Sequence, residues 1–395
     1  MLNAIIESRN ARQQDKPRLG NSMRIGIDAR MAYYTEAGIG QYIRRLVQGL
    51  AQFNGHEEFI LFQSRKDAAV MANTRRFQRR NLWTPSHHRL EQWVLPVEIA
   101  FANIDLFHSP DFIPPFWRNT RSVITIHDLH FLRYPRFLTR DAARYYGQID
   151  EAVRRTDHII AVSESTCQDT INLLGVPADR ITVIYEAADP AFRPIDDPQI
   201  LAQVRAKYNL PEKFVLFVST IEPRKNIPTL LRAQRILLDR HGPLAPLVIV
   251  GKRGWLFDEV FSLVAELDLE NDVRFLGRVP QEDLVLLYNA ATVHVHPAFY
   301  EGFGLPPLEA MTVGTPTIVS DVSSLPEVVG DAGWLVDPED VEGWAAAIGR
   351  LLADEDLRAD YRERGFKQAS KFSLERMARE TLAVYRRVIE AGDTL

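Results

Sequence analysis

The sequence predicts an α/β protein with two doubly wound domains, each a parallel sheet covered by helices on both faces. Short apolar segments typical of buried strands alternate with longer segments that have the apolar spacing of amphipathic helices. The alternation runs to residue 186, pauses, and begins again at residue 213. Two such series fit a chain of 395 residues, which is long enough for two domains.

The first series opens with a strand expected at 23–30 and a helix at 38–53. Further strands are expected at 58–64, 104–109, 122–129, 158–165 and 181–186, and a helical stretch at 139–156. We therefore place an N-terminal domain at 23–192, preceded by a polar extension over residues 1–22.

The second series opens with a strand at 213–220 and a helix at 227–241. Further strands are expected at 246–251, 272–277, 291–297 and 315–321. The join lies in 186–200, a segment rich in Pro and Asp, which gives a C-terminal domain over 193–371. The long amphipathic segment 372–391 follows no further strand, so we expect it to pack away from its own sheet.

Composition limits the functional classes. The chain is 46% hydrophobic and 25% charged, typical of a soluble globular protein, and no apolar run reaches the length of a membrane span. The single cysteine, Cys167, excludes an internal disulfide and fits a reducing cytoplasm, where we expect it to be structural. Residues 1–192 carry a net charge of +3 and residues 193–395 one of −8. This split argues against broad nucleic-acid binding but permits the first domain to face an anionic surface.

Two glutamates eight positions apart, Glu301 and Glu309, form the most informative pattern. They flank glycines and a pair of prolines in YEGFGLPPLEA, which reads as an open loop entering a helix. A helix N-terminus of this kind can bind a phosphate, and a carboxylate beside it can accept hydrogen bonds from a ribose diol. The alternative is a glycine loop before a helix whose acids merely favour the dipole.

Three further pairs are expected at the carboxyl ends of strands, where parallel sheets bind ligands. Gly38 and Gly40 open the first long helix and form either an anion site or a tight turn. His127 can hydrogen-bond a substrate oxygen, with Asp128 orienting its ring or binding a hydroxyl; a structural turn is the alternative.

Arg224 and Lys225 precede a helix N-terminus, where cations oppose the helix dipole. A bound diphosphate would resolve that conflict, because it is attracted to both the cations and the helix end.

Other basic and histidine-rich segments carry less information. His130 and the pair His294 and His296 suggest a metal, but carboxylate or cysteine partners at ligand spacing are not evident, so no metal is expected. Residues 74–83 contain four arginines, Arg75, Arg76, Arg79 and Arg80. On a helix these would form a stripe, with Phe77 and Trp83 as membrane anchors; a solvated basic face is the alternative.

Taken in order, the motifs resemble the retaining glycosyltransferases of family 4. The segments that carry the resemblance are AGIGQY, TIHDL, HIIAVSESTCQD, GVPADRITVIYEAADPAF, EPRKN and YEGFGLPPLEAMTVGTPTIVSD, and it covers about residues 23–390. The resemblance implies the GT-B fold, in which two Rossmann-like domains face each other across a cleft and the C-terminal helix crosses back to the first domain.

The resemblance also implies a role for each matching residue. Glu309 would hold the nucleotide ribose, and Glu301 would contact the donor sugar or its phosphate. The backbone of Phe303, Gly304 and Leu305 would meet the diphosphate and sugar. Lys225 and Arg224 would neutralise the leaving diphosphate. His127 would contact the donor sugar, with Asp128 supporting it, and Gly38 and Gly40 would let the first domain close over the donor phosphate.

Two positions depart from the family pattern. Ser219 stands six positions before Lys225, where many members have an arginine, so the cationic clamp rests on Arg224 and Lys225. At the end of the first domain many members read N-G-V-D, whereas this chain reads E-A-A-D from Glu186 to Asp189.

The resemblance therefore predicts a cytoplasmic, retaining glycosyltransferase that uses a sugar nucleotide, with GDP-mannose as the first choice of donor and a UDP-sugar as the alternative. The acceptor would be a glycan or a lipid-linked glycan, with peripheral membrane contact through the N-terminal domain. No metal or cofactor and no nucleic acid is expected. Competing classes are a sugar-nucleotide epimerase or hydrolase and a catalytically idle binding protein; a dehydrogenase is disfavoured because neither half has G-x-G-x-x-G.

Overall fold

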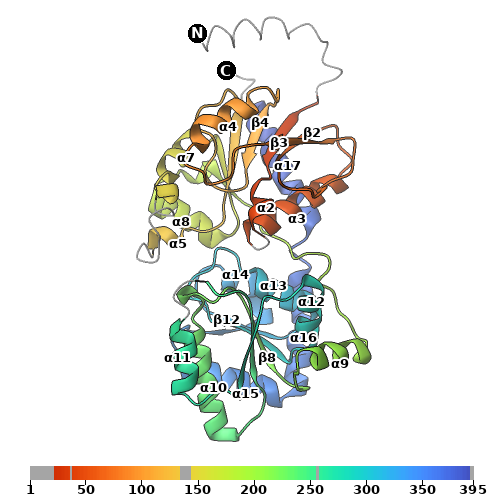
Figure 1. Ribbon diagram of the computed structural model, residues 1–395, viewed down its shortest axis with the longest axis vertical. Coiled ribbons are helices and arrows are strands. Elements are labelled where there is room, and N and C mark those ends of the chain that lie inside the picture. The colour runs from red at the N-terminus through yellow and green to blue at the C-terminus, as the bar shows by residue number, and fades with distance from the viewer. Residues whose placement is uncertain (1–21, 36–37, 134–143, 255–257, 392–395) are drawn as a thin grey trace, which may run out of the picture.

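A computed structural model describes residues 22–35, 38–133, 144–254 and 258–391. Two α/β domains are stacked along its longest axis and joined by an extended linker (Figure 1). The predicted extension over 1–22 falls almost entirely outside the described residues, as does the first part of the helix expected at 139–156.

The N-terminal domain contains a parallel sheet in the order β3-β2-β1-β4-β5-β6-β7. Its strands are β1 (Arg24–Asp28), β2 (Glu58–Ser64), β3 (Phe77–Leu82), β4 (Leu106–Ser109), β5 (Arg121–Ile126), β6 (His158–Ala161) and β7 (Ile181–Val183). Its helices are α2 (Met31–Tyr34), α3 (Ile39–Gln52), α4 (Glu91–Ile99), α5 (His130–Arg133), α7 (Ile149–Arg155) and α8 (Glu164–Leu174). The order reverses between β1 and β4, which makes a switch point at the carboxyl edge of this sheet.

The C-terminal domain repeats the plan with the order β10-β9-β8-β11-β12-β13. Its strands are β8 (Val215–Val218), β9 (Leu247–Val250), β10 (Val273–Gly277), β11 (Val293–His296), β12 (Thr317–Ser320) and β13 (Gly333–Val336). Its helices are α9 (Pro198–Lys207), α10 (Ile227–His241), α11 (Asp258–Glu266), α12 (Gln281–Ala290), α13 (Leu305–Val313), α14 (Leu325–Val329), α15 (Val341–Ala353) and α16 (Glu355–Ala369). The two parallel sheets confirm the predicted fold class.

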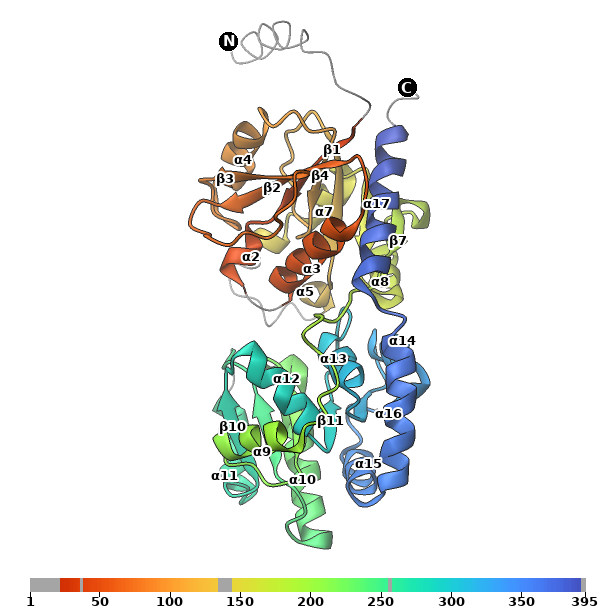
Figure 2. The ribbon, with the colours of Figure 1, turned by 90° about the vertical axis from the view of Figure 1, so that its right-hand side faces the viewer.

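The last helix, α17 (Leu374–Glu390), leaves the second domain and packs on the first, as the sequence predicts (Figure 2). Ser373 caps its start by accepting a hydrogen bond from the Arg376 N–H at 3.1 Å. Its apolar face lies against α3, and its buried Tyr385 meets His108 of β4, Oη to Nδ1, at 2.6 Å. The first domain is therefore completed by the end of the chain.

The helix suggested for residues 74–83 is wrong. Residues 77–82 form edge strand β3, which pairs in parallel with β2. Phe77 is not a membrane anchor, because its ring stacks on Phe59 at 4.6 Å. Arg76 hydrogen-bonds the carbonyls of Leu50 and Phe53 instead of joining a stripe. The cause is a tertiary contact: pairing with the apolar strand β2 outweighs the local preference of these residues for a helix.

An apolar cluster of the described residues crosses the domain boundary. It joins first-domain residues such as Tyr42 and Ile184 to Phe303 and Leu308 of the second domain and to Tyr385 of α17. The carboxyl ends of both sheets face this boundary, so the residues that follow the strands of each domain are brought together there.

Candidate functional site

Glu301 is the centre of a buried charged cluster at the end of β11. Its Oε1 accepts hydrogen bonds from Lys225 Nζ and, at 2.7 Å, is within hydrogen-bond distance of His296 Nε2. Its Oε2 is 3.2 Å from Arg224 Nη1. Ser323 holds the Glu301 backbone N–H at 3.0 Å. The structure thus brings Glu301 together with the neighbouring residues Lys225 and Arg224, which lie 76 and 77 positions before it in the sequence.

Arg224 also spans to other carboxylates. Its Nη2 lies 2.9 Å from Glu222 Oε1, and its Nη1 lies 4.0 Å from Asp128 Oδ2 in the opposite domain. Lys225 and Arg224 are therefore fixed in position and pre-ordered before any ligand arrives.

Charge interactions set the ionisation of this cluster. Burial alone would raise the pKa of Glu301, but the positive charges of Lys225 and Arg224 outweigh it and hold that pKa well below its usual range. Glu301 is therefore an anion at neutral pH and is not a proton donor. Burial and the charge of Arg224 lower the pKa of Lys225.

Gly302 lies directly against the first domain. A Cβ at this position would come within 1.8 Å of the His127 backbone oxygen, so glycine is required for the approach. The Gly302 carbonyl accepts hydrogen bonds from Ser163 Oγ at 2.5 Å and Thr166 Oγ1 at 3.1 Å. The loop that carries Glu301 is thus hydrogen-bonded to the first domain beside His127.

The expectation that Asp128 orients the ring of His127 is wrong. Asp128 Oδ1 lies 2.5 Å from His130 Nδ1, and this neighbour, with Arg224, holds the pKa of Asp128 low against its burial. The carboxylate that contacts the His127 ring is that of Glu186, whose Oε1 is 3.2 Å from Nδ1. Glu186 stands where many family members have the Asn of N-G-V-D. In this chain the departure therefore places a carboxylate beside the His127 ring.

Glu309 lies in the middle of α13 (Leu305–Val313), past its first turn, and is buried at the domain boundary. Arg45 of α3 donates from Nη2 to Glu309 Oε1 at 3.1 Å, and Tyr288 of α12 donates to Oε2 at 3.3 Å. Arg45 also donates to the Ala187 carbonyl at 2.9 Å. Burial raises the pKa of Glu309, and Arg45 opposes the rise. Glu309 therefore joins both domains and the linker in this state.

The segment between the two glutamates enters α13 as predicted. Gly304 caps the helix with a φ of 107°, which only glycine adopts without strain, and Leu305 begins the helix. The Phe303 side chain is buried in the core that crosses the domains. The proposed contacts of these backbone N–H groups with a diphosphate stay a prediction.

Gly38, Gly40 and Ser219 lie at the expected strand and helix ends. Gly38 precedes α3 with a φ of 51°, and a Cβ on Gly40 would come within 2.0 Å of the Thr35 carbonyl. Ser219 follows β8 and donates its backbone N–H to Val250 at 3.0 Å. The hydrogen bonds and ion pairs described for the Glu301 cluster do not include these three residues, so their roles are still predictions.

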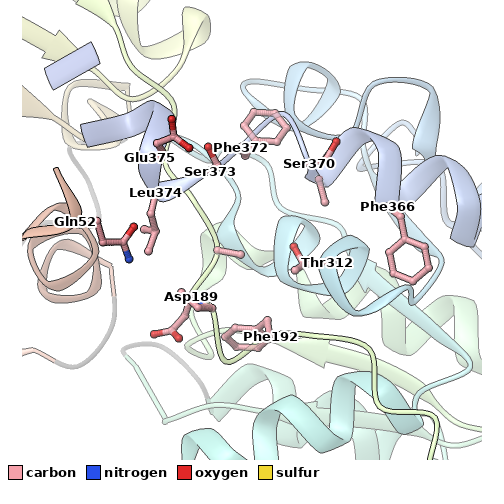
Figure 3. A pocket seen from close by; sticks show the side chains of 13 residues that line it. Gln52, Asp189, Phe192, Thr312, Phe366, Ser370, Phe372, Ser373, Leu374 and Glu375 are labelled. Carbon is pink, nitrogen blue, oxygen red and sulfur yellow. The ribbon is translucent and has the colours of Figure 1, made fainter. Parts of the chain in front are cut away.

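A cavity of about 470 Å³ lies where the chain crosses twice between the domains (Figure 3). Asp189 and Phe192 of the linker line one side of it, and Phe372 and Leu374 at the start of α17 line another. The cavity lining includes none of the predicted site residues. We assign it to the hinge between the domains and not to the donor site.

The two histidines of β11 and Cys167 are buried side chains with contacts inside the protein. His294 and His296 are buried on β11, where His294 contacts Thr317 and His296 contacts Glu301. Cys167 is a buried residue of α8. Within the described ranges, no group of three or more His, Cys, Asp or Glu side chains is arranged to hold a metal ion.

Sequence reasoning missed Arg45, Glu186 and Tyr288. Arg45 and Tyr288 sit within the helices α3 and α12, where no local signal in the sequence distinguishes them from solvent-facing or core residues. Glu186 did give a signal, since it occupies a departure from the family motif. Its partner could not be identified because His127 is 59 positions away.

Two family models match this chain, one in each half. The family described as "Glycosyltransferase Family 4" matches residues 37–192, and "Glycosyl transferases group 1" matches residues 202–368. The O-antigen chain mannosyltransferase B of Escherichia coli is 36% identical over 89% of this chain and 97% of its own length. The O-antigen chain mannosyltransferase RfbU of Salmonella typhimurium is 30% identical over 65% of this chain and 67% of its own length.

Solved structures agree on the fold. Sucrose-phosphate synthase from Thermosynechococcus elongatus superposes with a TM-score of 0.75 at 24% identity, covering 93% of this chain and 100% of its own. Anabaena HepE in complex with UDP and glucose has a TM-score of 0.74 at 19% identity, covering 92% and 100%. The two parallel-sheet domains of this chain and the helix that crosses between them are those of the GT-B fold. The matching families and relatives show that the chain belongs to the glycosyltransferases of family 4.

Proposed function

We propose that the protein is a retaining glycosyltransferase that moves a hexose, with mannose from GDP-mannose as the preferred donor, to a glycan or lipid-linked acceptor. The observation that carries the proposal is the pair of fixed cations, Lys225 and Arg224, held on Glu301 beside the first domain. The mannosyltransferase names of the similar bacterial proteins support the choice of sugar. A UDP-sugar is the alternative donor.

The proposed chemistry needs no metal. As the bond between the sugar carbon and the diphosphate breaks, its electron pair goes to the diphosphate, where Lys225 and Arg224 stabilise the charge. The acceptor hydroxyl attacks the same face of the sugar, and its proton passes to the departing diphosphate. Glu301 is ionised and held by the two cations, which supports a binding role and disfavours an acid role. Domain closure would exclude water and limit donor hydrolysis.

We propose that Glu309 anchors the donor ribose. Its carboxylate accepts hydrogen bonds from Arg45 and Tyr288. A carboxylate has about four lone-pair sites, so two remain to accept hydrogen bonds from the ribose diol. GDP-mannose is expected to raise the midpoint of thermal unfolding, because a ligand of the folded state stabilises it. The Glu309→Gln variant is expected to weaken donor affinity by about ten- to hundredfold, the cost of a hydrogen bond to a charged group. A donor titration of the unfolding midpoint measures this.

The control for that titration is Glu327→Gln. Glu327 also joins the domains, because it accepts from the backbone of Glu164 and Ser165 at 2.9 and 3.0 Å, but it has no proposed donor contact. Equal donor affinity in Glu309→Gln and the parent protein would place the ribose elsewhere. If UDP-glucose raises the unfolding midpoint and GDP-mannose does not, the donor is a UDP-sugar and the proposed GDP-mannose is wrong.

Product analysis in EDTA completes the test. Transfer of mannose from GDP-mannose to a lipid-linked glycan, with retained anomeric configuration, is the expected outcome. Free mannose or an epimer formed without an acceptor would indicate a hydrolase or an epimerase. Donor binding with no turnover would indicate an idle binding protein, and a strict metal requirement would contradict the leaving-group argument.

We also propose a cytoplasmic protein that contacts the inner face of the membrane through the N-terminal domain. The supporting surface, here called the tryptophan face, consists of exposed Trp83, Trp93, Val97 and Phe101. Trp93 and Phe101 are 72% and 64% exposed on or just after α4. Trp83 is tied to the same helix by Glu98, at 2.7 Å, and Arg65 lies 3.9 Å from its ring centroid. No helix among the described residues combines the length and the apolar character needed to cross a bilayer.

Trp93→Ser combined with Phe101→Ser is expected to reduce binding to vesicles of anionic phosphatidylglycerol by about tenfold or more, because two interface-seeking aromatic side chains are lost. Sedimentation with vesicles measures it. Leu244→Ser, at a 47% exposed leucine of the second domain, is the control. Unchanged vesicle binding by the double variant would refute the tryptophan face as the contact.

A further inference from the structure

Both ring nitrogens of His127 face oxygen atoms that can only accept hydrogen bonds. Nδ1 is 3.2 Å from Glu186 Oε1, and Nε2 is 2.9 Å from the Pro110 backbone carbonyl. A neutral imidazole has one N–H and one lone pair, so it would direct its lone pair at one of these two oxygens. The ring satisfies both contacts only when both nitrogens carry a proton.

The alternative is a proton on Glu186, so that a neutral His127 accepts from a carboxylic acid. A carboxylic acid is a stronger acid than an imidazolium, so a proton shared between the two groups resides on the ring. Nearby groups agree with this assignment. Burial lowers the pKa of His127, but the hydrogen bond and charge of Glu186 and the negative charge of Asp111 raise it overall.

The remaining neighbours of the ring do not compete for its proton. Tyr42 of α3 meets it edge-on, with centroids 4.7 Å apart. His108 of β4 is fully buried, which lowers its pKa to about 3 and keeps it neutral. Tyr42, Thr125, His108 and Tyr385 form a hydrogen-bonded chain with contacts of 3.2, 2.8 and 2.6 Å. This chain fixes the Tyr42 ring against His127 from the side of α17.

His127 stands at the contact between the two domains, beside the loop that carries Glu301. The His127 backbone oxygen lies against Gly302, next to Glu301. On the opposite side, Lys225 and Arg224 share Glu301, and Arg224 also contacts Glu222 and Asp128, so two cations are paired with three carboxylates. The position where many relatives add an arginine is Ser219.

We propose that Glu186 is a positioning residue that holds His127 as a fixed imidazolium, which supplies a positive charge to the donor site from the first domain and cannot act as a base. The charge role rests on the proposed function; the protonation state does not. Because both N–H groups are used within the first domain, the ring cannot take the proton of an acceptor hydroxyl, and that proton goes to the departing diphosphate.

Nitrogen-15 NMR of histidine-labelled protein, without any donor, tests the protonation state. Both ring nitrogens of His127 are expected to stay protonated as the pH rises past the ordinary histidine pKa of about 6.5. Glu186→Gln is expected to lower the pKa of His127 by about one to three pH units, the usual effect of losing a carboxylate partner. Asp128→Asn is the matched control: it changes the neighbour of His130 and is expected to leave the His127 signals in place. A neutral His127 in the parent protein would overturn the proposal.

The pH profile of sugar transfer tests the charge role. Because the pKa of His127 is raised in the folded protein, its cation persists above the ordinary value of about 6.5 and is lost as the pH rises through the folded pKa. Turnover is expected to fall over the same pH range. The Glu186→Gln variant is expected to show this fall at lower pH, and the Glu186→Asp variant to restore part of the parent protein's pH profile. If NMR shows the imidazolium but Glu186→Gln leaves the profile unchanged, the charge role is refuted. If no sugar is transferred at all, the proposed function fails while the NMR result stands.

Discussion

Lys225→Ala is expected to lower turnover by about 10²- to 10³-fold, the effect of removing one pre-ordered charge stabiliser from a water-poor site. The Lys225 side chain is only 8% exposed, and its Nζ is held on Glu301, so its position is set before the reaction. The effect should appear in kcat more than in the donor KM, because charge on the diphosphate grows as the bond breaks. Initial-rate kinetics with donor and acceptor varied separately measure both constants.

A surface lysine provides the control. Lys207 of α9 pairs with Asp283 at 2.6 Å but is 58% exposed, so Lys207→Ala is expected to leave turnover unchanged. Circular dichroism shows whether each variant is folded. Full activity in a folded Lys225→Ala protein would move the phosphate site away from this cluster.

Gly302→Ala is expected to lower turnover by about 10²-fold, because it prevents the domains from meeting as they do here. The new Cβ would lie 1.8 Å from the His127 backbone oxygen and 2.9 Å from Asp128 Cβ, so the Glu301 loop must move away from the first domain. A misplacement of about 1 Å at a reaction centre commonly has an effect of this size. Donor affinity should change less, since Glu309 and Lys225 belong to the second domain.

Gly365→Ala is the matched glycine control. Gly365 lies inside α16, where a Cβ would make ordinary contacts with Met311 at 3.6 Å, and alanine stabilises a helix by about 1 kcal/mol relative to glycine. Small-angle scattering compares the separation of the domains in the two variants. If Gly302→Ala keeps full turnover, the interdomain contact at His127 is not part of the reactive state.

The fold was largely accessible from sequence because its strands are short apolar runs that alternate with amphipathic helices. Two strands escaped. Residues 77–82 form β3, an edge strand of the N-terminal sheet, and they contain two arginines and little apolar content. Because an edge strand is less buried, the apolar pattern that identifies central strands is weak in β3. Residues 333–336 form β13, an edge strand of the C-terminal sheet, which is only four residues long.

The site was accessible wherever its residues follow strands or enter helices. Glu301, Lys225 and Arg224 fall at such ends, and the structure places them in contact. Partners from the other domain were not accessible, because Arg45 and Glu309 are 264 positions apart and nothing local relates them. Asp128 shows the opposite error: nearness in sequence suggested His127 as its partner, yet the backbone direction gives it His130.

The crossing of α17 bears on how the protein is made. During synthesis the first 192 residues emerge long before residues 374–390, and domains tend to fold in the order in which they appear. Until α17 arrives, the face of α3 and β4 that it covers has no partner, and His108 lacks its contact with Tyr385. The N-terminal domain is thus the first to begin folding and the last to finish. Throughout that interval the apolar face of α3 and β4 is exposed to solvent, where it can cause aggregation.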